Sequence, residues 1–395
     1  MSNAREVVVL SGVRTAIGDY GGALKDVPPT ELAAQIVREA VARAKIDPKQ
    51  VQQLVFGNVI HGEAKDMYFS RVACIKGGLP QDTTAMTVNR LCGSGLQAIV
   101  SAAQSILLGD ADAAVGGGAE SMSRGGYLMP NLRWGQRMND AGVTDMMVGA
   151  LTDPFDAVHM GITAENIAEQ WKITREQQDA FAVESHRRAI HAIEQGYFKD
   201  QILPVELKTR KGSTFFERDE HPRADVTAEG LAKLRAVFKK DGSVTAGNAS
   251  GINDGAAAVV LMEKEAAAKA GLKPMARLVA YGLAGVDPKI MGIGPVPAVQ
   301  NALKRAGLSI GDMDVIESNE AFAVQALAVS CDLKLDPKKT NPNGGAVGLG
   351  HPIGATGAIL TVKALYELQR TGGRYGLVTM CIGGGQGIAA IFERL

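Results

Sequence analysis

The sequence contains no cysteines close enough together to form a CxxC pair. Its four cysteines lie far apart, at positions 74, 92, 331 and 381. Zinc ribbons, thioredoxin-type centres and disulfide-stapled folds need closer or more numerous cysteines. The pattern therefore argues against a metal site or a disulfide framework, and it indicates free thiols, which suit a reducing compartment.

An excess of charge of either sign is also lacking, because 42 Lys and Arg balance 42 Asp and Glu. No basic surplus is present that would follow a nucleic-acid backbone. A strand is expected at residues 5–10, which leaves no room for a signal peptide before it. The uncharged stretch at residues 91–109 contains Gln, Ser and Gly, which favours a buried helix over a membrane span. We therefore expect a cytoplasmic protein with no nucleic-acid or membrane partner.

Aromatic residues are scarce at 5%, so the core must be mainly aliphatic, whereas the 47 glycines exceed ordinary usage. The length of 395 residues predicts two or three packed units. Strands are expected at residues 5–10 and 53–58, with a helix at 30–45 between them that has Thr30 as its N-cap. The alternation of strands and helices predicts an α/β fold with a largely parallel sheet.

A faint internal repeat suggests that the chain contains two similar halves. Residues 91–95 open an apolar helix, and so do residues 350–354. The strand at 113–115 runs into glycines 116–118, and the strand at 378–382 runs into glycines 383–385. The offset is about 260 residues each time, and the matches keep their order along the chain. Residues 121–247 differ in composition, contain both tryptophans and predict a long loop region with a helix at 175–195.

Cys92 is the first candidate for chemistry. It precedes a helix at residues 93–108 that is apolar on nearly all sides and is therefore expected to be buried. A cysteine at a helix N-terminus meets the positive end of the helix dipole, so we expect a lowered pKa. A buried structural cysteine remains an equal alternative from this motif alone.

His351 is the second candidate, in a glycine-dense loop at residues 341–354. The loop has neither the Lys-Ser/Thr ending of a P-loop nor a GxGxxG pattern. A histidine held in such a loop is placed to act as a base or a hydrogen-bond donor. A histidine that merely caps a helix is the alternative.

Two further motifs follow predicted strands. Cys381 precedes Gly383, and the glycines there allow backbone N–H groups to converge as in an oxyanion hole. Asn319 and Glu320 follow the strand at 315–316. Ligands gather at the carboxyl ends of strands in open α/β sheets, so all these motifs are expected to converge on one site.

Taken together, these stretches resemble the thiolase family, and especially its bacterial acetyl-CoA acetyltransferases and β-ketothiolases associated with polyhydroxyalkanoate producers. The matching segments span nearly the whole chain and are residues 89–95, 116–123, 245–255, 319–323, 343–357 and 381–387.

The resemblance implies a five-layer αβαβα fold built from two similar halves, with a loop domain inserted in the first. The N-terminal half would comprise residues 1–120 plus 248–272, and the C-terminal half residues 273–395. Residues 121–247 would form the loop domain, which covers the active site and takes part in assembly of a homotetramer.

The resemblance also implies the reaction and its residues. The expected function is that of an acyl-CoA C-acetyltransferase, which condenses acetyl-CoA with acetyl-CoA or a short acyl-CoA and, in reverse, cleaves a 3-ketoacyl-CoA with CoA. Cys92 would carry the acyl group, His351 would activate it, and Cys381 would move the α-proton. Asn319 would position a water beside His351 in one oxyanion hole, and the N–H groups of Cys92 and Gly383 would form the other.

Coenzyme A is thus expected as a cosubstrate, with no permanently bound cofactor and no metal. The residues that the resemblance places near CoA are Arg223, Ser250, His159, Met160, Ala246, Ala321 and Phe322. A basic cluster at Lys208, Arg210 and Lys211 is more typical of a solvated surface than of a phosphate site.

Two alternatives come from the same residues. A decarboxylating ketoacyl synthase shares the implied fold but typically has histidine or asparagine in place of the second cysteine, so Cys381 argues against it. A non-catalytic acyl-CoA-binding relative would be expected to have lost Cys92, His351 or Cys381. The preferred acyl chain length and the physiological direction do not follow from the sequence.

Overall fold

One large mixed sheet organises the chain in the computed structural model, which describes residues 5–209 and 212–395. Its strands follow the order β12-β13-β14-β11-β1-β10-β5-β3-β4, with β2 paired to β10. The strands are β1 (Val7–Arg14), β2 (Gly18–Asp19), β3 (Gln53–Gly57), β4 (Thr84–Val88), β5 (Ala113–Ser121), β10 (Asn253–Glu263), β11 (Ala276–Gly285), β12 (Val315–Ser318), β13 (Tyr375–Ile382) and β14 (Gln386–Arg394).

The expected repeat is present in the strand pairing. In the N-terminal half the order β3-β5-β10-β1 has one parallel pair followed by two antiparallel pairs. In the C-terminal half the order β12-β13-β14-β11 has the same sequence of pairings. Strands β1 and β11 then pair with each other and join the halves. The sheet is therefore more antiparallel than the sequence indicated, but four consecutive strands of each half correspond, whereas β2 and β4 have no counterpart among the described residues of the C-terminal half.

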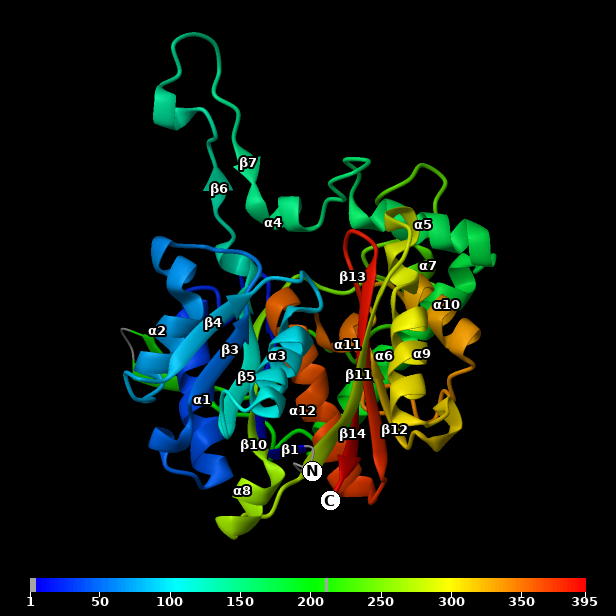
Figure 1. The fold of residues 1–395 in the computed structure, drawn as a ribbon. Helices are drawn as coiled ribbons and strands as arrows, with labels where there is room; N and C mark the ends of the chain where they lie inside the picture. Colours follow the sequence, from blue (N-terminus) through cyan, green and yellow to red (C-terminus); the bar gives the residue numbers. More distant parts are fainter. Residues whose placement is uncertain (1–4, 210–211) are drawn as a thin grey trace.

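The helices form three layers around the two parts of the sheet (Figure 1). The central layer consists of α3 (Ser94–Leu108) and α12 (Ile353–Thr371), which pack on each other and on strands of both halves. The outer helices of the N-terminal half are α1 (Pro29–Ala44) and α2 (Phe69–Lys76), with α8 (Lys264–Lys269) at its edge. Those of the C-terminal half are α9 (Pro295–Ala306) and α10 (Ala323–Leu333). This is the expected αβαβα layering.

Helix α3 belongs to the window at residues 91–108, which is long and apolar enough to cross a membrane by composition alone. In the structure it lies in the central layer against α12, β3 and β5. Its apolar character is therefore explained by packing on several sides.

Glycines let the central helices approach the sheet closely. A Cβ at Gly118 would lie 2.1 Å from the carbonyl oxygen of Gly354 in α12, and one at Gly57 would lie 2.7 Å from the same atom. Glycines 116–118 were expected beyond the end of a strand, but they lie inside β5. Helix backbone occupies the space that a side chain would need at Gly116 and Gly118, and the backbone of β10 occupies it at Gly117.

The prediction that Thr30 caps α1 is wrong. The helix begins at Pro29, its N-cap position is Pro28, and the Thr30 hydroxyl is buried without a hydrogen-bond partner among the described residues. Proline is favoured at the first helical position because its missing N–H would be unpaired there in any case.

The loop region holds short elements and two longer helices. The expected helix at 175–195 is α6 (Arg175–Glu194), and α5 (Met160–Trp171) was not foreseen. The other elements are β6 (Tyr127–Leu128), β7 (Thr144–Asp145), α4 (Met146–Ala150), β8 (Val205–Thr209), β9 (Gly212–Phe216), α7 (Ala228–Ala232) and α11 (Ala346–Leu349), the last of which belongs to the C-terminal half. The β6–β7 hairpin and the loop that it carries project away from the rest of the molecule (Figure 1).

Candidate active site

A small cavity brings together most of the residues predicted from the sequence. Its volume is about 50 Å³. The predicted residues among its lining are Cys92, His159, Met160, Ser250, Ala321, Phe322, His351 and Gly383. Leu91, Ala150, Leu151 and Met291 complete the lining and make it largely apolar. Segments from both halves and from the loop region therefore meet at the two residues proposed for acyl transfer.

Cys92 lies in a tight turn just before α3 rather than inside the helix. Leu91 adopts a positive φ of 44°, and the Ser94 hydroxyl accepts a hydrogen bond from the Arg90 N–H and donates one to the Leu91 carbonyl. Such a strained backbone persists only where its surroundings hold it, and it is frequent at functional sites. Ser94 thus fixes the turn that presents the thiol, a role that the sequence analysis missed.

The expectation of a lowered Cys92 pKa is not met. Burial raises the pKa of the Cys92 thiol to about 11, although the backbone N–H groups of Gly383 and of Cys92 itself bond the sulfur and oppose the rise. The nearby Glu120 carboxylate adds to the increase. Desolvation therefore outweighs the helix end, and Cys92 rests as a thiol that a neighbouring base would have to deprotonate before it could react.

His351 is held in one tautomer. Its Nδ1 lies 2.6 Å from Thr356 Oγ1, and that hydroxyl donates its only proton to the Pro352 carbonyl at 2.8 Å. The Thr356 oxygen must therefore accept a hydrogen bond from Nδ1–H, which leaves a lone pair on Nε2. Burial lowers the His351 pKa to about 4, so the ring is neutral at rest and its Nε2 can accept a proton.

The backbone of His351 is fixed by Asn253. The Asn253 side chain accepts a hydrogen bond from the His351 N–H at 2.8 Å and donates to the Gly18 carbonyl at 3.1 Å. Gly350, with φ of 104°, passes so close that a Cβ there would lie 2.5 Å from the Asn253 side chain. Thr356 and Asn253 were not singled out as site residues, although both lie in segments that the sequence analysis marked.

Asn319 and Cys381 flank this pair. Asn319 is fully buried, its Nδ2 lies 3.4 Å from His351 Nε2, and its Oδ1 has no partner among the described residues. Cys381 is fully buried at the end of β13. Burial, and then the charge of a Cys92 thiolate, raise the Cys381 pKa. The two cysteines are therefore close enough to influence each other electrostatically.

Two of the predicted CoA contacts, Arg223 and Ala246, do not line this cavity. Arg223 is largely exposed, pairs with Asp225 at 3.4 Å and lines a different cavity, and Ala246 is exposed. Lys208 is exposed and pairs with Glu206 at 3.9 Å, whereas Arg210 and Lys211 lie outside the described residues. His159, which does line the acyl cavity, stacks on Phe238 with ring centroids 4.5 Å apart, and burial lowers its pKa.

The chain is similar to known proteins along nearly its whole length. Residues 7–265 match the thiolase N-terminal domain, and residues 272–394 match the thiolase C-terminal domain. The chain is 66% identical to the beta-ketothiolase BktB of Cupriavidus necator over 99% of this chain and 100% of that protein.

Solved structures with the same fold include two named enzymes. The acetyl-CoA acetyltransferase of Bacillus anthracis superposes with a TM-score of 0.98 at 50% identity, covering 100% of both chains. Human mitochondrial 3-ketoacyl-CoA thiolase in complex with CoA superposes with a TM-score of 0.96 at 45% identity, covering 99% of this chain and 98% of that one. With both family domains matched along nearly its whole length, the chain belongs to the thiolase family.

Proposed function

We propose that this protein divides the work of carbon–carbon bond formation between two cysteines, with Cys92 as the acyl carrier and Cys381 as the base for the α-proton. The protein is an acyltransferase of the acyl-CoA C-acetyltransferase type. The observation that carries the division of labour is that Cys92, Gly383 and His351, whose Nε2 is unprotonated, line one cavity. Cys381 is fully buried and close enough for a Cys92 thiolate to raise its pKa.

In the first half-reaction, Nε2 of His351 takes the Cys92 proton as the sulfur attacks the thioester carbonyl. The N–H groups of Gly383 and Cys92, which already point at the sulfur, support the proposal that they stabilise the oxyanion. The bond between the acyl carbon and the CoA sulfur breaks, and the CoA thiolate takes a proton from Cys381. The acyl enzyme then contains an imidazolium at His351 and a thiolate at Cys381.

In the second half-reaction, the Cys381 thiolate takes the α-proton of acetyl-CoA. Its raised pKa makes it a strong base, as this weak carbon acid requires. The enolate oxygen is held on the side of Asn319 and His351, where the unpartnered Asn319 Oδ1 is suited to an ordered water. The enolate carbon attacks the acyl carbonyl, and Cys92 leaves and recovers its proton from His351.

The cavity of about 50 Å³ favours short acyl chains. Rates with acetoacetyl-CoA, 3-ketovaleryl-CoA and longer 3-ketoacyl-CoAs test this preference, and equal efficiency with long chains would contradict it. One solved structure with this fold, human mitochondrial 3-ketoacyl-CoA thiolase, is a complex with CoA. Here we propose that Ser250, His159, Met160, Ala321 and Phe322 line its inner path, with Arg223 and Ala246 farther out.

The division of labour is tested with purified variants. Cys92→Ser should abolish acyl labelling by acetyl-CoA, whereas Cys381→Ser should keep labelling and lose condensation. Loss of labelling in Cys381→Ser would contradict the assignment. Thiol consumption with acetoacetyl-CoA and CoA measures the overall reaction, and no turnover by the unmodified protein would favour a non-catalytic relative. Condensation that requires malonyl-CoA would instead indicate a ketoacyl synthase, which the relatives do not favour.

The loop region supports a proposed assembly role. Its projecting hairpin exposes large apolar side chains, including Tyr127, Leu132, Trp134 and Met138, which a monomer would leave in water. We infer a cytoplasmic homotetramer in which residues 121–247 act as the loop domain, inserted between residues 1–120 and 248–272 of the first half, with residues 273–395 as the second half.

A further inference from the structure

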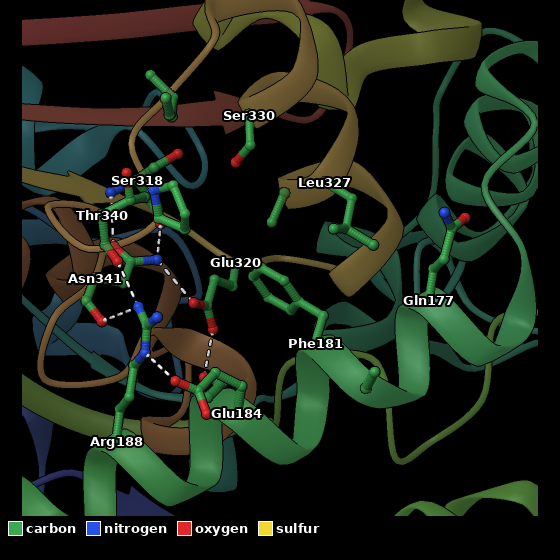
Figure 2. Close-up of a pocket in the computed structure, with 15 residues that line it drawn as sticks. Gln177, Phe181, Glu184, Arg188, Ser318, Glu320, Leu327, Ser330, Thr340 and Asn341 are labelled. Carbon is green, nitrogen blue, oxygen red and sulfur yellow. Dashed lines mark hydrogen bonds and ion pairs between the residues drawn. The ribbon is translucent and has the colours of Figure 1, made fainter. Parts of the chain in front are cut away.

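Glu320 is a buried carboxylate that stands next to Asn319 but faces away from the acyl cavity. It is 2% exposed and follows β12, whose end carries both residues. Successive side chains in an extended segment point to opposite sides, so Asn319 reaches His351 while Glu320 reaches backward. Behind it lies a separate cavity of about 400 Å³ between α6 and α10, shown in Figure 2.

Both carboxylate oxygens of Glu320 accept hydrogen bonds. Oε1 accepts from Asn341 Nδ2 at 2.7 Å, and Oε2 accepts from the Ser185 hydroxyl at 2.6 Å and from the Val347 N–H at 3.2 Å. Figure 2 shows Glu320 between the Asn341 loop and α6. Gly345 leaves the room for it, since a Cβ there would lie 2.1 Å from the carboxyl carbon.

These partners hold the segment that delivers His351. Ser185 Oγ also accepts from the N–H groups of Gly345 and Gly348, at 3.2 and 3.1 Å. Together, Ser185 and Glu320 thus satisfy three backbone N–H groups around α11, which ends at Leu349, two residues before His351. A single short helix, α11, therefore connects the hydrogen bonds of Glu320 to the backbone of His351.

The same carboxylate holds the strand end that delivers Asn319. Asn341 donates to Glu320 and to the Ser318 carbonyl at 2.8 Å, and its Oδ1 accepts from the Ser318 N–H at 2.9 Å. Glu320 is thus linked to both members of the Asn319–His351 pair. It directly follows Asn319 in the chain, and it is connected to His351 through its hydrogen bond to α11.

We propose that Glu320 is a positioning residue that sets the register between Asn319 and His351, with Ser185 of the loop region as its partner. A glutamine cannot replace it, because every partner donates to the carboxylate and one glutamine position is itself a donor. Misplacing reacting groups by even 1 Å slows a reaction by about 100-fold. The inference rests on the proposed function, since its readout is turnover.

The test compares Glu320→Gln and Ser185→Ala with Ser330→Ala, which changes another residue lining the same cavity. For thiolysis of acetoacetyl-CoA we expect kcat to fall about tenfold or more in the first two variants, with KM for CoA within about threefold of the unmodified protein. Ser330→Ala should leave both constants unchanged. The double variant Glu320→Gln/Ser185→Ala should lose less than the product of the single effects, because the residues act as one unit.

Turnover by the unmodified protein decides the proposed function separately, and only the ratio of variant to unmodified protein decides this inference. Retention of kcat within twofold in Glu320→Gln would overturn it, as would an equal loss in Ser330→Ala. A loss that appears in KM alone would also overturn it. If Glu320→Gln does not fold, Ser185→Ala carries the test, and failure of both to fold would mean a structural role instead.

Discussion

The structure predicts that the hydroxyl of Thr356 controls which nitrogen of His351 is the base. In Thr356→Val the side chain keeps its shape but loses the oxygen that accepts from Nδ1–H among the described residues, at a site where His351 and Thr356 are 5% and 2% exposed. The ring must then leave this N–H unpaired or move the proton to Nε2. A proton on Nε2 removes the lone pair that we propose as the acceptor of the Cys92 proton.

The size of the effect follows from the unpaired group. A buried donor left without a partner costs about 1–3 kcal/mol. Each 1.36 kcal/mol corresponds to a factor of ten in rate, so acyl transfer should slow by about 5- to 160-fold. The assay is the rate at which acetyl-CoA labels Cys92, followed by mass spectrometry alongside steady-state thiolysis.

A matched control lies on the same helix. Thr361 is fully buried and donates only to the Gly357 carbonyl at 2.8 Å, so Thr361→Val has a similar cost in stability without touching His351. Thr361→Val should label Cys92 at the normal rate, and Thr356→Ser, which restores the hydroxyl, should recover most of the loss. Normal labelling in Thr356→Val, or equal slowing in Thr361→Val, would refute the reasoning.

Three further results are expected. Because burial raises the Cys92 pKa to about 11, the thiolate should be only about a thousandth of the total at pH 8. The rate at which iodoacetamide alkylates Cys92 in the free enzyme should therefore keep rising about tenfold per pH unit past pH 8.5. A rate that levels off near pH 8.5 would contradict the raised pKa. Arg14→Met removes the cation that pairs with the fully buried Asp219 carboxylate at 2.7 Å. The free energy of unfolding measured in urea should fall by about 3–5 kcal/mol, because a buried charge is left without its partner. An unchanged midpoint and slope of the urea transition would show that the ion pair is dispensable. Replacing the exposed apolar side chains of Leu132 and Trp134 by Ser should reduce the mass measured by light scattering below that of a tetramer, and an unchanged mass would exclude the projecting hairpin as an assembly element.

Much of the fold was predictable because its signals are local. The helix-opening segments at 91–95 and 350–354 correctly indicated two matching helices, which are α3 and α12 in the central layer. Whether neighbouring strands run parallel or antiparallel was predicted less well. The antiparallel partner of β5 is β10, which lies far along the chain, and the antiparallel partner of β13 is β14, which follows it across a tight turn. Glycines 116–118 were placed outside their strand for a similar reason, because the backbone that excludes their side chains comes from three other elements, α3, β10 and α12.

The sequence by itself pointed to Cys92, His351, Asn319 and Cys381 as the candidates for the chemistry, because they lie in motifs that can be recognised without coordinates. It could not determine their protonation. The helix end predicted a lowered Cys92 pKa, but burial raised it, and burial is a property of all the segments that enclose the thiol. Only the tertiary structure decided that the resting pair is a thiol and a neutral imidazole, since the Thr356 hydroxyl and the dry surroundings together select that state.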